Sequence, residues 1–66
     1  QALTEREQQV AALICLQYRT NQIAARLQIA PETVRSHVHN ILNKMKLPNR
    51  IALRQSLADW DFSSWA

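Results

Sequence analysis

The amino-acid sequence predicts one small domain built entirely of α-helices. Three observations support this: the chain has 66 residues, it contains no glycine, and 47% of its residues are apolar. A chain of this length has room for one modest core, which excludes a second folded domain and leaves little space for a deep catalytic cavity. Without glycine, the tight Asn-Gly and Asp-Gly turns of β-hairpins and the glycine-rich loops that hold nucleotides are both missing. We therefore expect an all-α fold.

The first helix is predicted over residues 4–17. Thr4 followed three residues later by Glu7 is typical of a capping box, in which side-chain oxygens bind two backbone N–H groups at the helix start. Apolar residues then recur at helical spacing, namely Val10, Leu13 and Ile14. We expect Cys15, beside this apolar face, to fill space in the core, because no basic residue is placed to lower its pKa and one cysteine cannot form an internal disulfide.

Three further helices follow, separated by short breaks. Their predicted ranges are residues 20–27, 31–46 and 50–58. Pro31 suits the first position of a helix, where its missing N–H has no partner to lose, and Asn49 is a good N-cap for the last helix. The second and third helices are separated by three or four residues, which is the layout of a helix-turn-helix.

Aromatic residues mark the end of the chain. Trp60, Phe62 and Trp65 lie in a tail, residues 59–66, that follows no clear helical period. We expect these rings to complete a thin core by packing back on the helices. The alternative is that the tail and the fourth helix form a protein-binding surface, which would make the chain a helical protein-interaction module.

The positive charge of the protein is concentrated in its middle segment. The net charge is +3, to which residues 1–18 contribute −1, residues 19–46 contribute +4 and residues 47–66 contribute nothing. A localised basic segment favours a polyanionic partner, with an ordinary solvated surface as the alternative.

The third predicted helix has separate apolar and polar faces. Its apolar residues form one stripe on a helical wheel: Val34, Val38, Ile41, Leu42 and Met45. The opposite arc is polar: Arg35, Ser36, His39 and Asn43. A polar flank lies between them: Thr33, His37, Asn40 and Lys44. Beyond Glu32 these faces carry no acidic residue, whereas ordinary solvated helix faces usually mix acids with bases.

Such a helix suits the major groove of duplex DNA. Arginine, serine, histidine and asparagine side chains can hydrogen-bond the base edges exposed there. A basic flank can contact phosphates, which position the protein without reading sequence. We therefore favour DNA binding, with a solvent-exposed polar face as the alternative.

Other kinds of site find little support in the sequence. His37 and His39 are two residues apart on a helix, so they diverge and cannot bind one metal ion. Ser36 and His37 are adjacent and do not face each other, so a hydrolase site is not expected. We expect no enzyme activity, no metal and no cofactor. No apolar run approaches the roughly 20 residues needed to cross a membrane.

Four motifs follow one another along the chain: Leu3-Thr4-x-Arg6-Glu7-x-x-Val10, Asn21-x-Ile23-Ala24-x-x-Leu27-x-Ile29, Thr33-Val34-Arg35-x-His37-x-x-Asn40-Ile41-x-x-Lys44-Met45, and Asn49-Arg50. In this order and spacing they closely resemble the LuxR-type, or GerE-type, DNA-binding domain of bacterial transcription regulators. The segment Lys44-Met45-Lys46-Leu47 looks like the nitrate-response NarL branch. The resemblance covers about residues 3–58.

The resemblance implies a four-helix bundle whose third helix enters the major groove. The base-reading residues that it implies are Arg35, Ser36 and His39. The contacts to the DNA backbone that it implies are Thr20, Asn21, Thr33, His37, Asn40 and Lys44. The fourth helix is the usual dimerisation surface of such domains, which here implicates Ile51 and Arg54.

The resemblance also implies partners. We expect the chain to bind double-stranded DNA as a homodimer on paired half-sites, with RNA polymerase as a further candidate partner. An upstream receiver or ligand-binding domain usually controls DNA access in such proteins, as in a two-component response regulator. Because the chain begins at Gln1 without an initiator methionine, we expect it to be a piece of a longer, cytoplasmic bacterial regulator.

The sequence departs from the family pattern at several helix ends. The family often has glycine where Gln17 and Lys46 stand, so we expect Lys46 to be strained or its helix to run on. Arg19 stands where a capping serine is common, which leaves Thr20 as the expected cap of the second helix. Ala30 replaces a serine that caps the third helix, which removes one phosphate contact.

Overall fold

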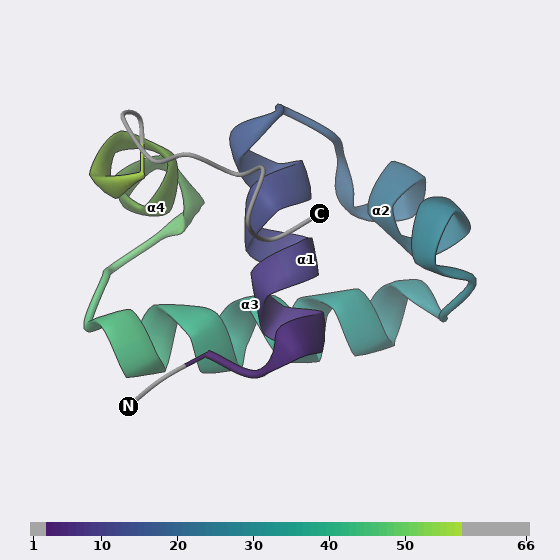
Figure 1. The fold of residues 1–66 in the computed structure, drawn as a ribbon, viewed down its shortest axis with the longest axis horizontal. Coiled ribbons are helices and arrows are strands. Elements are labelled where there is room, and N and C mark those ends of the chain that lie inside the picture. Colours follow the sequence, from purple (N-terminus) through teal and green to yellow (C-terminus); the bar gives the residue numbers. More distant parts are fainter. Residues whose placement is uncertain (1–2, 58–66) are drawn as a thin grey trace.

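The computed structural model describes residues 3–57, and within this range it contains four helices and no strand (Figure 1). The helices are α1 (Glu5–Cys15), α2 (Thr20–Leu27), α3 (Pro31–Met45) and α4 (Arg50–Ser56). The predicted all-α fold is confirmed. The aromatic tail at residues 59–66, and with it the expected packing of its rings, lies outside the described residues.

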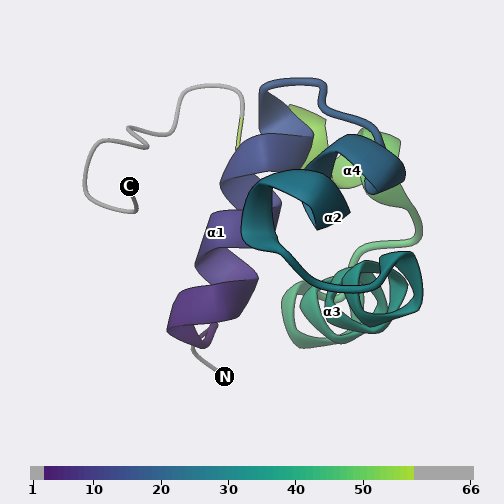
Figure 2. The ribbon, with the colours of Figure 1, turned by 90° about the vertical axis from the view of Figure 1, so that its right-hand side faces the viewer.

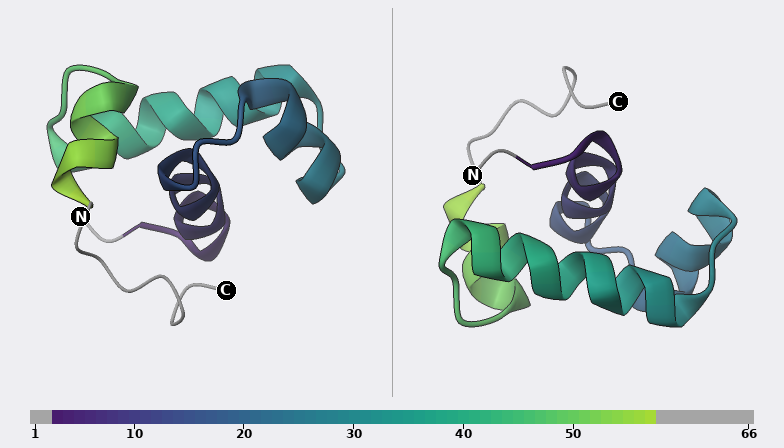
Figure 3. Two further views of the ribbon diagram at one scale, coloured as in Figure 1. Left: turned by 90° about the horizontal axis from the view of Figure 1, so that it is seen from above. Right: turned by 90° about the horizontal axis from the view of Figure 1, so that it is seen from below.

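α3 is the longest helix, and the other three lie on one side of it. α1 packs against α3, while α2 and α4 contact α3 toward its two ends (Figure 1). Figure 2 looks along α3 and Figure 3 shows it from above and from below. In these views α1, α2 and α4 share one side of α3, so the opposite side of this helix is not covered by any of them.

The core forms where the apolar faces of the four helices meet. Its buried residues are Val10, Ala11, Ile14, Ile23, Ala24, Val34, Val38, Ile41, Leu53 and Leu57. Three members of the predicted apolar stripe of α3 are among them, and the other two, Leu42 and Met45, are partly buried against this cluster. Each large aliphatic side chain that is fully buried contributes about 1.5–3 kcal/mol. The stripe therefore fixes which side of α3 faces the protein.

The N-termini of the first and last helices are capped as predicted. Glu7 N donates to Thr4 Oγ1 at 3.1 Å, and Thr4 N donates to Glu7 Oε1 at 2.9 Å, which completes the capping box of α1. At α4, Ala52 N donates to Asn49 Oδ1 at 2.9 Å. These bonds satisfy backbone donors that have no partner within their own helix.

The start of α2 differs from the expectation. Thr20 is the first helical residue and the N-cap is Arg19, which provides no side-chain cap because a guanidinium has no acceptor atom. Instead, Arg19 N donates to Gln22 Oε1 at 2.8 Å. Gln22, three residues after the N-cap, thus accepts one of the two hydrogen bonds of a capping box. Thr20 is therefore not the cap of α2.

Three helices are followed by a left-handed residue that is not glycine: Gln17 (φ 70°), Gln28 (φ 57°) and Lys46 (φ 57°). The next residue is partly buried against the core each time, and its N–H donates to a carbonyl five residues earlier: Tyr18 to Leu13 at 3.1 Å, Ile29 to Ala24 at 3.0 Å, Leu47 to Leu42 at 2.9 Å. This bond and the apolar contact are those of a Schellman motif. They offset the roughly 1–2 kcal/mol that a residue with a Cβ loses in this conformation.

These helix ends explain where the predicted boundaries fail. α1 ends at Cys15 and α3 at Met45, both short of the predicted limits, because Gln17 and Lys46 turn the chain away. The expected strain at Lys46 is confirmed. The strained Gln28 was not foreseen.

Candidate nucleic-acid interface

The uncovered side of α3 carries the predicted base-reading residues. Arg35, Ser36 and His39 are all exposed. Arg35 and His39 also border a hollow of about 620 Å³ between α3 and the start of α4. With 15 residues, α3 is about 22 Å long, which is enough to follow a major groove across several base pairs. The buried stripe on its other side holds the helix firmly in place.

Among residues 3–57, Arg35 has one weak partner. Its Nη1 lies 3.8 Å from Glu32 Oε1, one helical turn earlier, and the two side chains are 64% and 80% exposed. An ion pair this exposed contributes about 0–1 kcal/mol. Arg35 is therefore available to a competing acceptor such as a base edge.

The residues expected at the DNA backbone divide into two groups. Asn21, Thr33 and Asn40 are exposed, at the start of α2 and along α3. His37 and Thr20 are half-buried, and Thr20 Oγ1 accepts a hydrogen bond from Arg50 Nη1 at 2.8 Å. This bond connects the first turn of α2 to the first turn of α4.

Lys44, on the polar flank of α3, is half-buried and has a partner on α1. Its Nζ is 2.7 Å from Glu7 Oε1, in an ion pair that joins α3 to α1, and the two side chains are 23% and 5% exposed. Lys44 lies one turn after the buried Ile41, at the edge of the apolar stripe, so its long side chain reaches over the stripe to the carboxylate. The structure thus gives Lys44 a partner inside the protein.

Glu7 is a structural residue that the sequence analysis recognised only in part. Burial by itself would raise the pKa of this carboxyl, but the hydrogen bond and charge of Lys44, together with the bonds from Thr4, outweigh that effect and hold it below its usual value. The overlooked signal is its spacing. Leu3, Glu7, Val10 and Ile14 follow one another at helical intervals, which places the carboxylate on the apolar face of α1.

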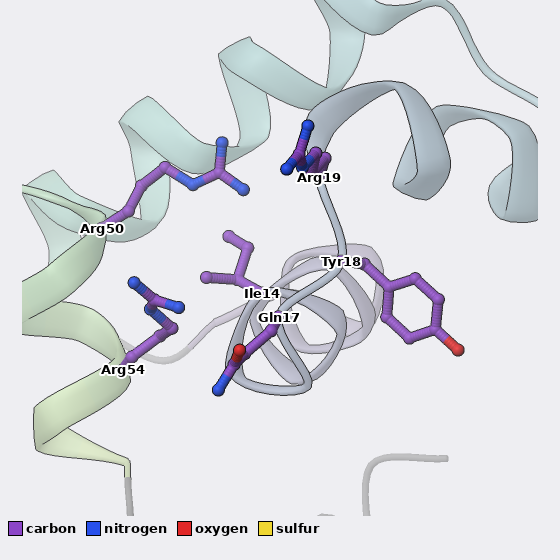
Figure 4. A pocket seen from close by; sticks show the side chains of 6 residues that line it. All are labelled: Ile14, Gln17, Tyr18, Arg19, Arg50 and Arg54. Atoms are coloured by element: carbon purple, nitrogen blue, oxygen red, sulfur yellow. The ribbon is translucent and has the colours of Figure 1, made fainter.

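A second hollow lies where the end of α1, the start of α2 and α4 meet (Figure 4). It has a volume of about 410 Å³ and is lined by Ile14, Gln17, Tyr18, Arg19, Arg50 and Arg54. Burial, reinforced by the charge of Arg54, lowers the pKa of the half-buried Arg50. No pattern in the sequence predicts this grouping, because Arg19 belongs to a different segment from the two arginines of α4.

Residues 1–57, which include all four helices, match the family described as bacterial regulatory proteins, luxR family. The chain belongs to the luxR family. It is thereby a DNA-binding helix-turn-helix domain of the kind found in transcription regulators. No solved structure matches the chain.

In this luxR-family domain, α4 presents an exposed apolar residue, Ile51, which is 58% exposed. Ile51, Arg54 and Gln55 line a further hollow with Cys15 and Gln17 at the end of α1. Burial raises the pKa of the Cys15 thiol, and the charge of Arg54 opposes that rise. A basic residue does therefore lie near this cysteine, contrary to the expectation, but burial has the larger effect and the thiol stays protonated at neutral pH.

Two further findings concern the described part of the luxR-family domain. Within residues 3–57, no three histidine, cysteine or acidic residues gather in a way that could hold a metal ion. None of the helices in that range is long and apolar enough to cross a membrane.

Proposed function

We propose that this domain binds duplex DNA in a sequence-specific manner, with α3 lying in the major groove, as part of a bacterial transcription regulator. The observation that carries this proposal is the uncovered side of α3. It presents Arg35, Ser36 and His39 to solvent, and the only acidic residue on this helix is Glu32 in its first turn. A helix exposed in this way can enter the groove without rearranging the rest of the fold.

Each base-reading side chain has a distinct role in this proposal. Arg35 donates two hydrogen bonds to the O6 and N7 atoms of a guanine, which is the commonest specific contact in the major groove. Ser36 is short and fits close to the base edges, while His39, one turn after Arg35, reads a neighbouring base pair. Since Val34, Val38 and Ile41 are buried on the other side, the helix keeps its orientation while these residues read the groove.

Contacts to the sugar–phosphate backbone set the position of α3 in the groove. Asn21, Thr33 and Asn40 are exposed and carry neutral donors, and His37 lies on the same flank. Thr20 can also donate from its hydroxyl, because Arg50 occupies only an acceptor site of that oxygen. Lys44 is left out of this set because its ammonium is paired with Glu7.

The domain would act as a homodimer on paired half-sites, using the surface of α4 around Ile51 and Arg54. Ile51 is the large exposed apolar residue of α4. A seven-residue helix offers little contact area, so we expect the domain alone to be monomeric and to pair only on DNA. In the complete regulator, which we place in the bacterial cytoplasm, an upstream receiver or ligand-binding domain would control DNA access, and RNA polymerase is a candidate partner.

Selection of bound sequences from a random duplex pool tests the proposal. The wild-type domain should enrich a motif with a fixed half-site spacing, and its affinity should fall linearly with salt on a log–log plot. Arg35→Ala should lose about 1–3 kcal/mol of discrimination at one base position of that motif. Arg6→Ala, an equal loss of charge on the exposed start of α1, should leave the motif unchanged. An Arg35→Ala motif identical to the wild type would rule out the placement of α3 in the groove.

A further inference from the structure

Three arginines from two separate parts of the chain surround one hollow. Arg50 and Arg54 extend from α4, and Arg19 lies opposite them at the start of α2 (Figure 4). In this view Arg50 and Arg54 point toward the segment that carries Arg19. The buried, apolar Ile14 also lines this hollow.

The positive charge of this hollow is not balanced within the described part of the protein. The two ion pairs found among residues 3–57, Glu32–Arg35 and Glu7–Lys44, involve none of the three arginines. No carboxylate lines the hollow either. Its three guanidinium groups instead raise the positive potential at one place, and the charge of Arg54 adds to the effect of burial in lowering the pKa of Arg50. An anion bound there would lower this potential.

The hollow adjoins the proposed DNA-reading surface through Arg50. This residue lines the three-arginine hollow and also the hollow that Arg35 and His39 border. Its guanidinium is bound to Thr20 in the first turn of α2, another expected backbone contact. Arg50 therefore connects the edge of the reading surface to the three-arginine hollow.

We propose that this three-arginine hollow binds a phosphate group of the DNA backbone beside the groove that α3 enters. This inference rests on the proposed function and adds a contact to it. Guanidinium groups suit a phosphate because their N–H donors match its oxygens in pairs. A cavity of about 410 Å³ accommodates one phosphate with its bridging waters.

The lining of the hollow favours a phosphate over a nucleotide base. Tyr18 is its one aromatic residue, and Figure 4 shows the ring of Tyr18 pointing away from the three arginines. Arg26 lies over that same ring, 4.8 Å from its centroid. No aromatic face is thus presented to a base inside the hollow.

Salt-dependent DNA binding of matched variants tests this site. The double variant Arg19→Gln/Arg54→Gln removes two guanidinium groups and leaves the Arg50–Thr20 bond intact. The control Arg6→Gln/Lys46→Gln removes the same charge from two exposed positions outside the hollow. Fluorescence anisotropy on one duplex, between about 50 and 200 mM salt, gives the slope of log K against log salt for each protein.

Loss of one phosphate contact should reduce that slope by about 0.9 in the double variant and leave it unchanged in the control. Equal slopes in the two variants would overturn the assignment. The slope should also fall in the single variant Arg19→Gln. If the double variant does not fold, the slope of this single variant is compared with that of the control instead. Arg19 also lies outside the proposed dimer surface of α4, so its effect is independent of dimerisation.

A second measurement separates a backbone phosphate from a free anion. The Tm of the wild-type domain is compared in inorganic phosphate and in chloride at equal ionic strength. A phosphate-specific rise that the double variant loses, with no change in its DNA slope, would assign the hollow to a free anion and overturn our proposal. The proposed function fails separately, if the wild-type domain shows no salt-dependent binding to duplex DNA or if Arg35→Ala does not alter its sequence preference.

Discussion

Replacing Lys44 by methionine would leave the carboxylate of Glu7 buried without its cation. Removing one partner of a buried pair costs about 3–5 kcal/mol. Glu7 is 5% exposed, but Lys44 is 23% exposed and Glu7 keeps its bond from the Thr4 backbone, so we place the loss near the low end, at about 3 kcal/mol. In a domain of this size each 1 kcal/mol corresponds to about 4–8 °C in Tm, so the Tm should fall by about 12–24 °C.

The same substitution should weaken the loss of stability in acid. In the wild type the pKa of Glu7 lies below its ordinary value of 4.5, so its contribution to stability is present above pH 4.5 and is lost as the pH falls below it. Without Lys44, its hydrogen bond and its charge no longer lower the pKa of Glu7, so the folded-state pKa rises from its wild-type value toward the ordinary one. Acidification below pH 4.5 should then cost Lys44→Met less stability than it costs the wild type.

Urea unfolding followed by circular dichroism, at pH 7 and at several values down to pH 4, measures both effects. Lys46→Met is the matched control, because it removes the same charge from an exposed side chain. If Lys44→Met destabilises the domain no more than Lys46→Met, or loses as much stability in acid as the wild type, the buried pair does not hold α1 against α3. If the slope of log K against log salt for DNA binding falls by about 0.9 in folded Lys44→Met, Lys44 does contact a phosphate.

Two smaller changes test other parts of the structure. Lys46→Gly should stabilise the domain by about 1 kcal/mol in urea unfolding, because glycine adopts the left-handed conformation without steric cost; a loss of stability would contradict the strain assigned to Lys46. Ile51→Glu should leave binding to a single half-site unchanged and abolish cooperative binding to paired half-sites in sedimentation and anisotropy experiments, because it puts like charges at the centre of the proposed dimer surface. Unchanged cooperativity would place that surface elsewhere.

Much of the fold was predictable because it depends on interactions between residues close in sequence. The capping box of Thr4 and Glu7 and the Asn49 cap are each formed by residues three apart. The division of α3 into a buried and an exposed face follows from helical periodicity alone. Arg35, Ser36 and His39 are exposed, as that periodicity predicts.

Helix ends were harder to predict because the backbone preference of one residue competes there with the packing of the next residue against the core. Gln17, Gln28 and Lys46 adopt a conformation that their side chains disfavour, since the apolar residue after each one packs against the core. Sequence comparison pointed to two of these positions, through missing glycines, but not to Gln28. Gln22, rather than Thr20, completes the start of α2 because its amide oxygen reaches back to the Arg19 N–H.

The sequence by itself determined an all-helical domain, a helix-turn-helix and the polar face that α3 exposes. Only the tertiary structure decided the roles of residues whose partners are distant in the chain. Lys44 pairs with Glu7 across 37 positions, and Arg50 binds Thr20 across 30. A count of charged residues gives only the net charge of the protein. The packing of the helices decides which cations are neutralised inside the fold and which remain available to a phosphate. For that physical reason the three-arginine hollow emerges from the packing of α1, α2 and α4.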